Sequence, residues 1–159
     1  MSFRIGTGTD FHRLQEGLPL WIGGVLIPHY KGALGHSDAD VLLHAICDAM
    51  LGALCLGDIG VHFPDTSEEF RNADSKLLLR KTTEMVHDHG YRVVNIDSTL
   101  CLQTPKIRPY IGQMQKIIAG ITGVAETDVS VKATTTEELG FVGREEGLMA
   151  CAITLLSKL

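Results

Sequence analysis

The stretch FRIGTGTDFH, residues 3–12, alternates between bulky apolar side chains and small or polar ones. Successive side chains of a strand point to opposite faces, so this alternation predicts a strand with two different faces. One face is apolar and consists of Phe3, Ile5 and Phe11. The other begins without bulk and becomes polar: Gly6, Gly8, Asp10 and His12. We expect the two glycines to leave room for a substrate beside the polar pair.

The segment SDADVLLHAICDAM, residues 37–50, predicts the helix that packs against this strand. Side-chain oxygens at its beginning suit the free amides of a first helical turn, so we expect a helix from about Ala39 to Leu54. Polar residues recur within it at every fourth position and line one stripe: Asp40, His44 and Asp48. Packing of this stripe on the opening strand brings His44 to the polar pair of the strand.

One carboxylate and two imidazoles then form a ligand set that suits zinc: Asp10, His12 and His44. Three protein ligands leave one coordination position open, as catalytic zinc sites do. Asp48, one turn further along the helix, is expected to orient the His44 ring. The alternative is that these side chains are only hydrogen-bonded residues of the surface or core, and that Asp38 and Asp40 serve the helix start alone.

The rest of the chain contains neither a repeat nor a linker, which predicts one domain over residues 1–159. Gly23-Gly24 marks a short hairpin or bulged strand pair, and the polar segment 58–75 is predicted to be a mobile loop. Further helices are expected over 75–90 and from Thr104 to Ile121, where Pro109 is the alternative start of the regular part. Further strands are expected over 91–103, 127–136 and 147–159. The predicted fold class is α+β, a mostly antiparallel sheet with helices packed on one face.

The last predicted strand, GLMACAITLLSKL at residues 147–159, is apolar on nearly both faces. Antiparallel sheets usually keep one face in water, so we expect both sides of this strand to be covered. In so small a domain, a partner subunit is the natural cover.

Two segments have the composition of phosphate-binding sites. Thr104-Pro105-Lys106 places a cap, a rigid first position and a cation at a predicted helix start, although an ordinary helix start has the same pattern. The segment KATTTEELGFVGREEG, residues 132–147, offers threonine hydroxyls and loop amides for phosphate or ribose oxygens and a carboxylate for Mg²⁺. High β propensity is the alternative role of the threonines, and Arg144 serves either to pin a turn or to hold phosphate.

The composition excludes several classes of protein. A net charge of −5 argues against a nucleic-acid surface, and no run of about 18 uncharged apolar residues predicts a membrane span. The N-terminal residues show no targeting pattern. The four cysteines form no C-x-x-C pair, so we expect buried free thiols in a reducing cytoplasm rather than a zinc ribbon.

Taken together, several motifs closely resemble the 2-C-methyl-D-erythritol 2,4-cyclodiphosphate synthase family. They follow one another in order and register from about residue 4 to 157: GTDFH at 8–12, HSDADVLLHAICDAMLGA at 36–53, GDIGVHFPDT at 57–66, QTPK at 103–106 and VKATTTEELGFVGREEG at 131–147. The resemblance implies a homotrimer whose sheets meet around the threefold axis, with active sites between subunits. It also implies zinc on Asp10, His12 and His44, and a location in a bacterial cytoplasm or, after removal of a transit peptide, in the plastid stroma.

The resemblance assigns the substrate contacts residue by residue. The methylerythritol-phosphate end would contact His36, Ser37, Asp58, Gly60, Phe63 and Asp65. The cytidine diphosphate end would contact, on a neighbouring subunit, Leu102, Lys106, Ile107, Arg108, Ala133, Thr134 and Thr135. Glu137 would hold Mg²⁺ or Mn²⁺ between the phosphates. The remaining substrate-binding residues that the resemblance implies are Phe141 and Arg144. The implied catalytic residues are His36, Asp58, Thr135 and Glu137.

The implied reaction is a cyclisation by a phosphorus–oxygen lyase, in which the 2-phosphate of 4-diphosphocytidyl-2-C-methyl-D-erythritol 2-phosphate attacks the β-phosphorus and CMP leaves. Cys151 stands where some family members carry a glutamate that pairs with the arginine. The resemblance therefore predicts Arg144 without that partner and leaves open whether an isoprenoid diphosphate binds on the axis. The alternative functions are a metal-dependent phosphohydrolase of a nucleotide-linked substrate and a non-catalytic trimer that senses nucleotides or isoprenoids.

Overall fold

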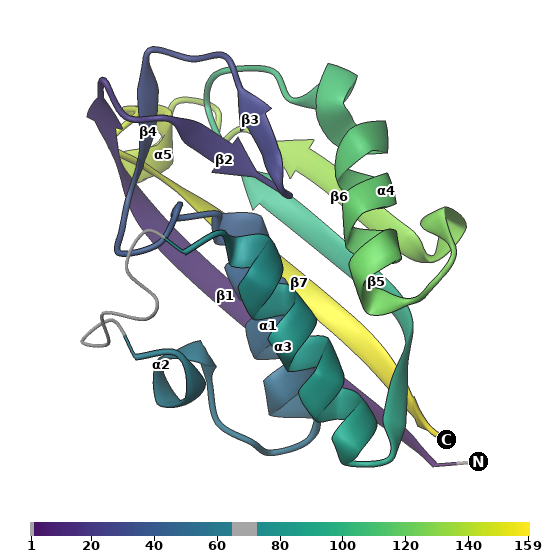
Figure 1. Ribbon diagram of the computed structural model, residues 1–159. Helices are drawn as coiled ribbons and strands as arrows, with labels where there is room; N and C mark the ends of the chain where they lie inside the picture. Colours follow the sequence, from purple (N-terminus) through teal and green to yellow (C-terminus); the bar gives the residue numbers. More distant parts are fainter. Residues whose placement is uncertain (1, 65–72) are drawn as a thin grey trace.

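A five-stranded sheet in the order β4-β1-β7-β5-β6 forms the centre of the protein (Figure 1). This computed structural model describes residues 2–64 and 73–159. The strands are β1 Phe3–Glu16, β2 Leu20–Ile22, β3 Val25–Ile27, β4 Lys31–Leu34, β5 Tyr91–Cys101, β6 Val129–Thr134 and β7 Gly147–Lys158. The helices are α1 Val41–Ala53, α2 Ile59–His62, α3 Ser75–Asp88, α4 Ile111–Thr122 and α5 Gly140–Gly143, with single 3₁₀ turns η2 at Arg108–Tyr110 and η3 at Glu126–Asp128.

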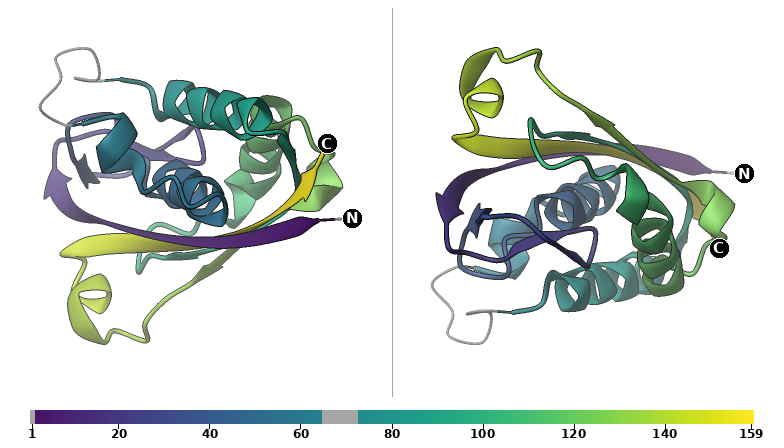
Figure 2. Two further views of the ribbon diagram at one scale, coloured as in Figure 1. Left: turned by 90° about the horizontal axis from the view of Figure 1, so that it is seen from below. Right: turned by 90° about the horizontal axis from the view of Figure 1, so that it is seen from above.

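The pairing of the strands confirms a mixed α+β fold with a mostly antiparallel sheet. β1 runs antiparallel to both β4 and β7, and β7 runs antiparallel to β5. Only β5 and β6 are parallel, while β2 and β3 form a separate hairpin at Gly23-Gly24. α1, α3 and α4 cover one face of the sheet, whereas the four-residue helix α5 lies on the other side (Figure 2). No helix in the described ranges is long and apolar enough to cross a bilayer.

The two glycines of the opening strand permit close packing of α1 on β1. A Cβ atom on Gly6 would lie 1.9 Å from the carbonyl oxygen of Ala49, and one on Gly8 would lie 2.1 Å from that of Ala45. The expectation that these glycines leave room for a substrate is therefore wrong, because the backbone of α1 occupies that space. Their role is to bring the helix that carries His44 against the strand that carries Asp10 and His12.

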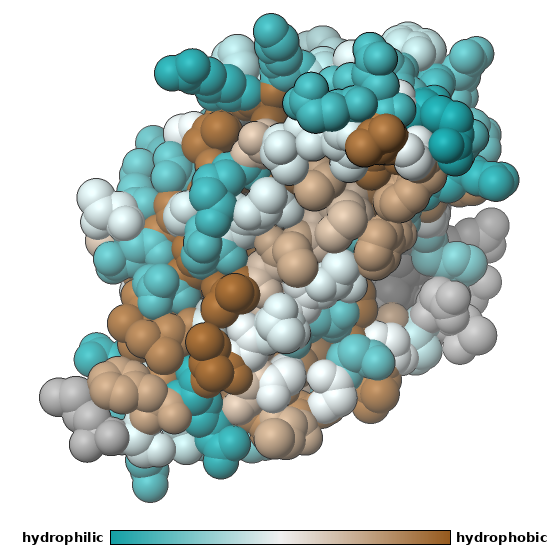
Figure 3. Space-filling model, turned by 180° about the vertical axis from the view of Figure 1, so that it is seen from behind, coloured by the Kyte–Doolittle hydropathy of each residue, from teal (hydrophilic) through white to brown (hydrophobic). Residues whose placement is uncertain are grey.

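The opposite face of the sheet exposes large apolar side chains: Phe3 at 54%, Ile5 at 71%, Phe11 at 55% and Ile153 at 46%. The ion pair of Lys132 with Asp97 lies on the same face. Figure 3 views the molecule from this side and shows tan and white groups over its centre, with brown groups mainly beside them and hydrophilic groups along the upper edge. The helix-facing side chains of β7, such as Leu148 and Leu156, are fully buried, so one face of this strand is covered within the chain. Ile153 on the other face is exposed, and the cover expected for that face stays a prediction.

Several local expectations need correction. α4 begins at Ile111 rather than at Thr104, because Leu102 still donates its N–H to Thr134 of β6. The alternative start at Pro109 is the better prediction, since Pro109 lies in η2, which leads directly into α4. The sequence prediction lacks β4, α2 and α5, which are each four residues long and too short to show a periodicity. α2 lies within the segment expected to be a loop; residues 65–72 of that segment lie outside the described residues.

The four cysteines are free, as predicted, but only Cys47 is buried. Burial raises the pKa of the Cys47 thiol to about 12. Cys55 is exposed because it follows the last turn of α1, and Cys101 and Cys151 are half-buried on adjacent strands. The expectation of four buried thiols is therefore wrong for three of them.

Candidate metal centre and substrate pockets

Three side chains from β1 and α1 converge on one point, as the sequence predicted. Asp10 Oδ2 lies 3.0 Å from His12 Nε2 and 3.1 Å from His44 Nδ1. The two imidazole nitrogens lie 3.2 Å from each other. The alternation of β1 and the packing of α1 on its glycine face therefore place all three donors together.

This triangle has the dimensions of three ligands around one small cation. Ligand atoms about 2.0–2.1 Å from a tetrahedral zinc ion lie about 3.3 Å from one another, close to the separations observed here. Among the described residues, the Asp10, His12 and His44 group is the one cluster whose donor atoms suit a metal ion. Two nitrogens and one carboxylate oxygen are the donor set of several catalytic zinc sites, in which a fourth position stays open. The residues present therefore fit a divalent ion such as zinc.

Hydrogen bonds on the far side of each imidazole leave the inward nitrogen available. His12 Nδ1–H donates to the carbonyl oxygen of Leu34 at 3.1 Å, so Nε2 presents its lone pair to the site. His44 Nε2 instead contacts Ser75 Oγ at 2.9 Å and Ser37 Oγ at 3.2 Å. Such outer contacts orient metal-binding imidazoles.

Asp48 does not orient His44, contrary to the expectation. Its Oδ1 accepts the N–H of Ile59 at 2.8 Å, which ties the first residue of α2 to α1. The i+4 spacing places Asp48 on the correct stripe, but its carboxylate is engaged by α2 rather than by the imidazole. Asp40 is the N-cap of α1, as predicted, and also accepts from the amides of Gly23 and Gly24 at 2.9 and 2.7 Å.

The electrostatics of the three donors are strongly coupled. Burial alone would raise the pKa of Asp10, but its contacts with the His12 and His44 imidazoles outweigh burial and lower that pKa well below its usual range. Burial alone would lower the pKa of His12, but the hydrogen bond and charge of Asp10 outweigh it and raise that pKa. A divalent cation binds the deprotonated form of such donors, so it would compete with protons at this cluster.

A pocket of about 430 Å³ opens directly onto the three donors. Besides them, it is lined by Gly35, His36, Ser37, Ile59, Gly60, Phe63 and Leu78. Four of the residues expected at the methylerythritol-phosphate end therefore lie around the metal centre. Asp58 lies beside this pocket as the N-cap of α2, where its side chain accepts from Val61 N at 3.1 Å. Asp65 lies outside the described residues.

A second pocket, of about 220 Å³, lies where β5 and β6 end. Its lining contains every residue expected at the cytidine diphosphate end: Leu102, Lys106, Ile107, Arg108, Ala133, Thr134 and Thr135. Gln103 and Pro105 complete it. Thr104-Pro105-Lys106 is irregular rather than a helix start, so a phosphate here would meet loop amides and a lysine instead of a helix terminus.

The loop after β6 holds Glu137 next to Thr135. Thr135 Oγ1 donates to Glu137 Oε1 at 3.0 Å and accepts from Glu137 N at 3.2 Å. Glu137 and Glu138 have positive φ angles of 50° and 63°, an uncommon conformation outside glycine that the loop contacts maintain.

Phe141 packs on Phe11, with ring centroids 6.0 Å apart, on the exposed side of the sheet.

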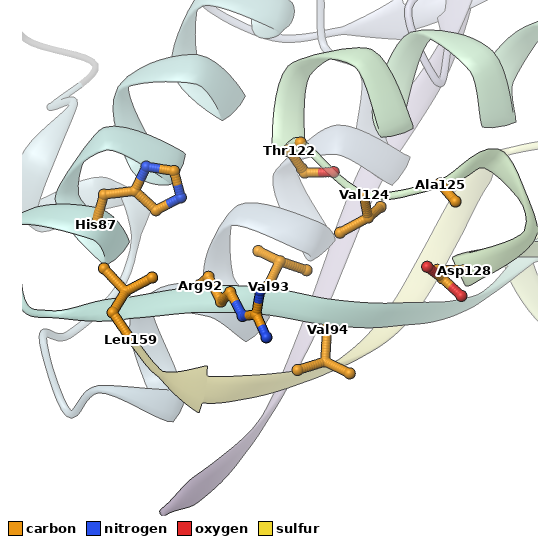
Figure 4. Close-up of a pocket in the computed structure, with 10 residues that line it drawn as sticks. His87, Arg92, Val93, Val94, Thr122, Val124, Ala125, Asp128 and Leu159 are labelled. Carbon is orange, nitrogen blue, oxygen red and sulfur yellow. The ribbon is translucent and has the colours of Figure 1, made fainter.

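A further pocket, of about 510 Å³, lies between the ends of α3 and α4 and the start of β5. Figure 4 shows His87 and Leu159 at one end and Asp128 at the other, with valine side chains between them. None of the residues predicted for the site lines it.

A family model described as the YgbB family matches residues 3–157. The chain belongs to the YgbB family. A protein from Bacteroides thetaiotaomicron named 2-C-methyl-D-erythritol 2,4-cyclodiphosphate synthase is 55% identical over 158 residues, which cover 99% of each chain. The family predicted from the motifs is therefore confirmed.

Solved structures in this family have the same fold. The bifunctional IspDF from Campylobacter jejuni matches with a TM-score of 0.95 and 41% identity over 99% of this chain, which spans only 43% of that longer protein. IspF from Plasmodium falciparum, solved as a CDP complex, matches with a TM-score of 0.86 and 33% identity over 99% of this chain and 97% of that one.

Arg144 retains a carboxylate partner in this member of the YgbB family. Its Nε and Nη2 donate to the two carboxylate oxygens of Glu146, each at 3.0 Å. Arg144 therefore has a partner other than the glutamate that some family members carry at the position of Cys151. Cys151 Sγ lies 3.1 Å from the hydroxyl of Thr9, its neighbour on strand β1.

Two residues beside the metal centre were not predicted from the sequence to lie next to His44. Ser75 begins α3, and its hydroxyl lies against His44. Asp38 bonds to Ser75 through both its side-chain oxygens, although the sequence suggested only a helix start. Their separation of 37 residues leaves no local spacing from which the contact could be predicted.

Proposed function

We propose that this chain is a 2-C-methyl-D-erythritol 2,4-cyclodiphosphate synthase, a phosphorus–oxygen lyase of the non-mevalonate isoprenoid pathway. Its reaction converts 4-diphosphocytidyl-2-C-methyl-D-erythritol 2-phosphate to 2-C-methyl-D-erythritol 2,4-cyclodiphosphate and CMP. The observation that carries the proposal is the convergence of Asp10, His12 and His44 at a pocket that His36 and Ser37 also line. Full-length relatives that bear the enzyme's name support it.

The chemistry needs positioning and charge relief rather than a protein nucleophile. The 2-phosphate of the substrate forms the new bond to the β-phosphorus, and the bond between that phosphorus and the bridging oxygen of CMP breaks. Folding a polyanion so that one phosphate contacts another brings like charges together, and alignment lowers the entropic part of the barrier. A zinc ion held by Asp10, His12 and His44 would supply positive charge to the phosphate oxygens.

The protein groups around the metal centre would orient the reacting end of the substrate. His36 and Ser37 line the pocket next to the donors, and Gly60 and Phe63 also line it. Asp58, the residue before α2, would contact the methylerythritol-phosphate end. In the second pocket, Lys106 and the threonines would hold the diphosphate, while Glu137, fixed by Thr135, would bind Mg²⁺ or Mn²⁺ between the phosphates.

The two pockets lie on different parts of one chain, which supports active sites shared between subunits. Asp10 pairs with Ala150, Ala150 with Leu100 and Leu100 with Ala133, so the metal centre and second pocket are three strand spacings, about 14 Å, apart. Ala150 and Leu100 between them are fully buried. The straight line between the two pockets of one chain therefore runs through buried residues.

We infer a homotrimer in which the apolar sheet faces meet around the axis. The exposed side chains Phe3, Ile5, Phe11 and Ile153 are the surface that such an assembly would cover. Light scattering should give three times the chain mass of 17.3 kDa. A monomer at assay concentration contradicts the shared active site. The bacterial relatives support a cytoplasmic location in a bacterium.

Product analysis tests the reaction itself. Incubation of the enzyme with Mg²⁺ and substrate should yield CMP and the cyclic diphosphate in equal amounts, without inorganic phosphate. Release of inorganic phosphate would instead identify a phosphohydrolase. Tight nucleotide binding without turnover in a metal-replete sample would identify a sensing protein.

Replacement of Lys106 by alanine should raise the KM about tenfold or more with a smaller change in kcat, because a charge-assisted contact to phosphate is worth about 1.5–3 kcal/mol. Lys116→Ala provides a matched control, since Lys116 lies on the exposed side of α4 and lines neither pocket. Steady-state kinetics of both variants measure the effect. An unchanged KM for Lys106→Ala contradicts its assignment to the diphosphate.

A further inference from the structure

The His44 ring has a different environment at each nitrogen. Nδ1 faces Asp10 Oδ2 at 3.1 Å and His12 Nε2 at 3.2 Å, in the candidate metal centre. Nε2 points the other way, to Ser75 Oγ at 2.9 Å. Ser75 is the first residue of α3 and is fully buried, so water does not compete for this contact.

The hydrogen atoms in this chain of contacts can be assigned from the acceptors. The Ser75 hydroxyl donates to Asp38 Oδ1, while Asp38 Oδ2 accepts the Ser75 N–H at 3.1 Å. Asp38 Oδ1 also accepts the N–H of Asp40 at 3.2 Å, so this carboxylate acts only as an acceptor. A hydroxyl has a single hydrogen. Ser75 Oγ therefore faces His44 with a lone pair, and the hydrogen of that contact belongs to His44 Nε2.

We propose that Ser75 and Asp38 are positioning residues of the metal centre, which hold His44 as the Nε2–H tautomer so that Nδ1 presents its lone pair to the metal ion. This inference rests on the proposed zinc centre and extends it to two residues that do not contact the metal. The Asp10 carboxylate, 3.1 Å from Nδ1, is the competing acceptor for the ring hydrogen in the metal-free protein. A ring that placed its hydrogen on Nδ1 would have no electron pair to offer there, and metal affinity would fall accordingly.

Ser37 is the competing partner of the same nitrogen. Its Oγ lies 3.2 Å from His44 Nε2 and already accepts the N–H of Ala39 at 3.1 Å. Ser37 is only half-buried. Within the described residues, its hydroxyl contacts His44, Ser75 and the N–H of Ala39 but no carboxylate that would fix its hydrogen. Ser75, which is closer, buried and oriented by Asp38, therefore determines the tautomer.

The framework around this contact is fixed by the fold. Asp38 N–H donates to the carbonyl oxygen of Ala73 at 3.1 Å, so the segments that precede α1 and α3 bond to each other through backbone and side chain. The position of Ser75 relative to His44 thus follows from the packing of these two helix starts rather than from the sequence near either residue.

Zinc affinity of the metal-free protein, measured by competition with a chromophoric chelator, tests the proposal without any activity assay. Ser75→Ala should lower the affinity about tenfold to one-hundredfold. Ser37→Ala should lower it less than about threefold, because the tautomer does not depend on it. Thr83→Ala is the matched control, because Thr83 is a buried hydroxyl residue of the same helix that donates only to Leu79 O. It should destabilise α3 without changing zinc affinity.

Asp38→Asn provides a second variant in case Ser75→Ala fails to fold. Its amide can donate a hydrogen to Ser75 Oγ, which frees the Ser75 hydroxyl to donate to His44 Nε2 and so favours the opposite tautomer. Nitrogen-15 NMR of His44 in the metal-free protein, at a pH above the imidazole titration, should show Nε2–H in the unaltered chain. It should show mixed or reversed tautomers in Asp38→Asn and Ser75→Ala.

The outcomes separate this proposal from the proposed zinc centre. An unaltered protein that binds no zinc overturns the centre, and the positioning role with it, whatever the tautomer. An unaltered protein that binds zinc, but carries the hydrogen on His44 Nδ1 in its metal-free state, overturns the positioning role alone. The positioning role is also overturned if Ser75→Ala keeps full zinc affinity, or if Ser37→Ala costs more affinity than Ser75→Ala.

Discussion

Replacement of His44 by alanine is expected to abolish zinc binding and turnover together, with a fall in kcat/KM of at least about 10³-fold. His44 supplies one of three donors, and its Nδ1 lies about equally far from the other two. Two remaining donors would hold a divalent ion weakly, and the phosphate oxygens would lose the positive charge that offsets their repulsion. Elemental analysis of the dialysed protein and steady-state kinetics measure the two effects on one sample.

His89→Ala is the matched control for this experiment. His89 is an exposed histidine at the end of α3 whose Nδ1 contacts Met85 O, away from both proposed substrate pockets. It should keep its zinc and its rate. A His44→Ala protein with full zinc occupancy and full activity would show that the metal centre has been placed on the wrong residues.

Replacement of Gly8 by alanine should destabilise the protein by more than about 3 kcal/mol, because the new methyl group meets backbone rather than a movable side chain. Its Cβ would lie 2.1 Å from Ala45 O and 2.6 Å from Ala49 N. α1 would have to move away from β1 and carry His44 with it. Zinc affinity should therefore fall along with the free energy of unfolding.

Gly52→Ala separates this effect from a general response to an added methyl group. Gly52 lies on α1, and a Cβ there would meet only Thr7 O at 3.6 Å, an ordinary contact. Alanine favours a helix interior over glycine by roughly 0.5–1 kcal/mol, so this variant should be as stable as the unaltered protein or more so. Denaturant unfolding compares the two variants, and equal stability of Gly8→Ala and the unaltered chain would refute the close packing of α1 on β1.

The metal ligands could be predicted because their positions follow from local periodicities. Asp10 and His12 are two residues apart on a strand and therefore share a face, and His44 lies on the stripe of α1 that packs against it. Gly6 and Gly8 were correctly placed on the same face of the strand as Asp10 and His12. The role predicted for the glycines was wrong, because a missing side chain indicates a close approach but not whether a ligand or a helix approaches.

Contacts between distant segments could not be predicted from the sequence alone. Ser75 and Asp38 reach His44 through the packing of two helix starts, and β4 pairs with β1 over only four residues. For Asp48 the local spacing was correct but the predicted contact was wrong, because its carboxylate accepts the N–H of Ile59 rather than orienting His44. Likewise, the contact between Arg144 and Glu146 was not predicted from the sequence, although the two residues lie on one turn.

The most direct test of the metal centre is a crystal structure of the zinc-loaded protein with anomalous scattering recorded at the zinc edge. The predicted result is one anomalous peak per chain, within about 2.0–2.2 Å of Asp10 Oδ2, His12 Nε2 and His44 Nδ1, with a fourth position facing the pocket. A peak on other residues, or no peak at this triangle in excess zinc, would contradict the metal centre on which the proposed reaction depends.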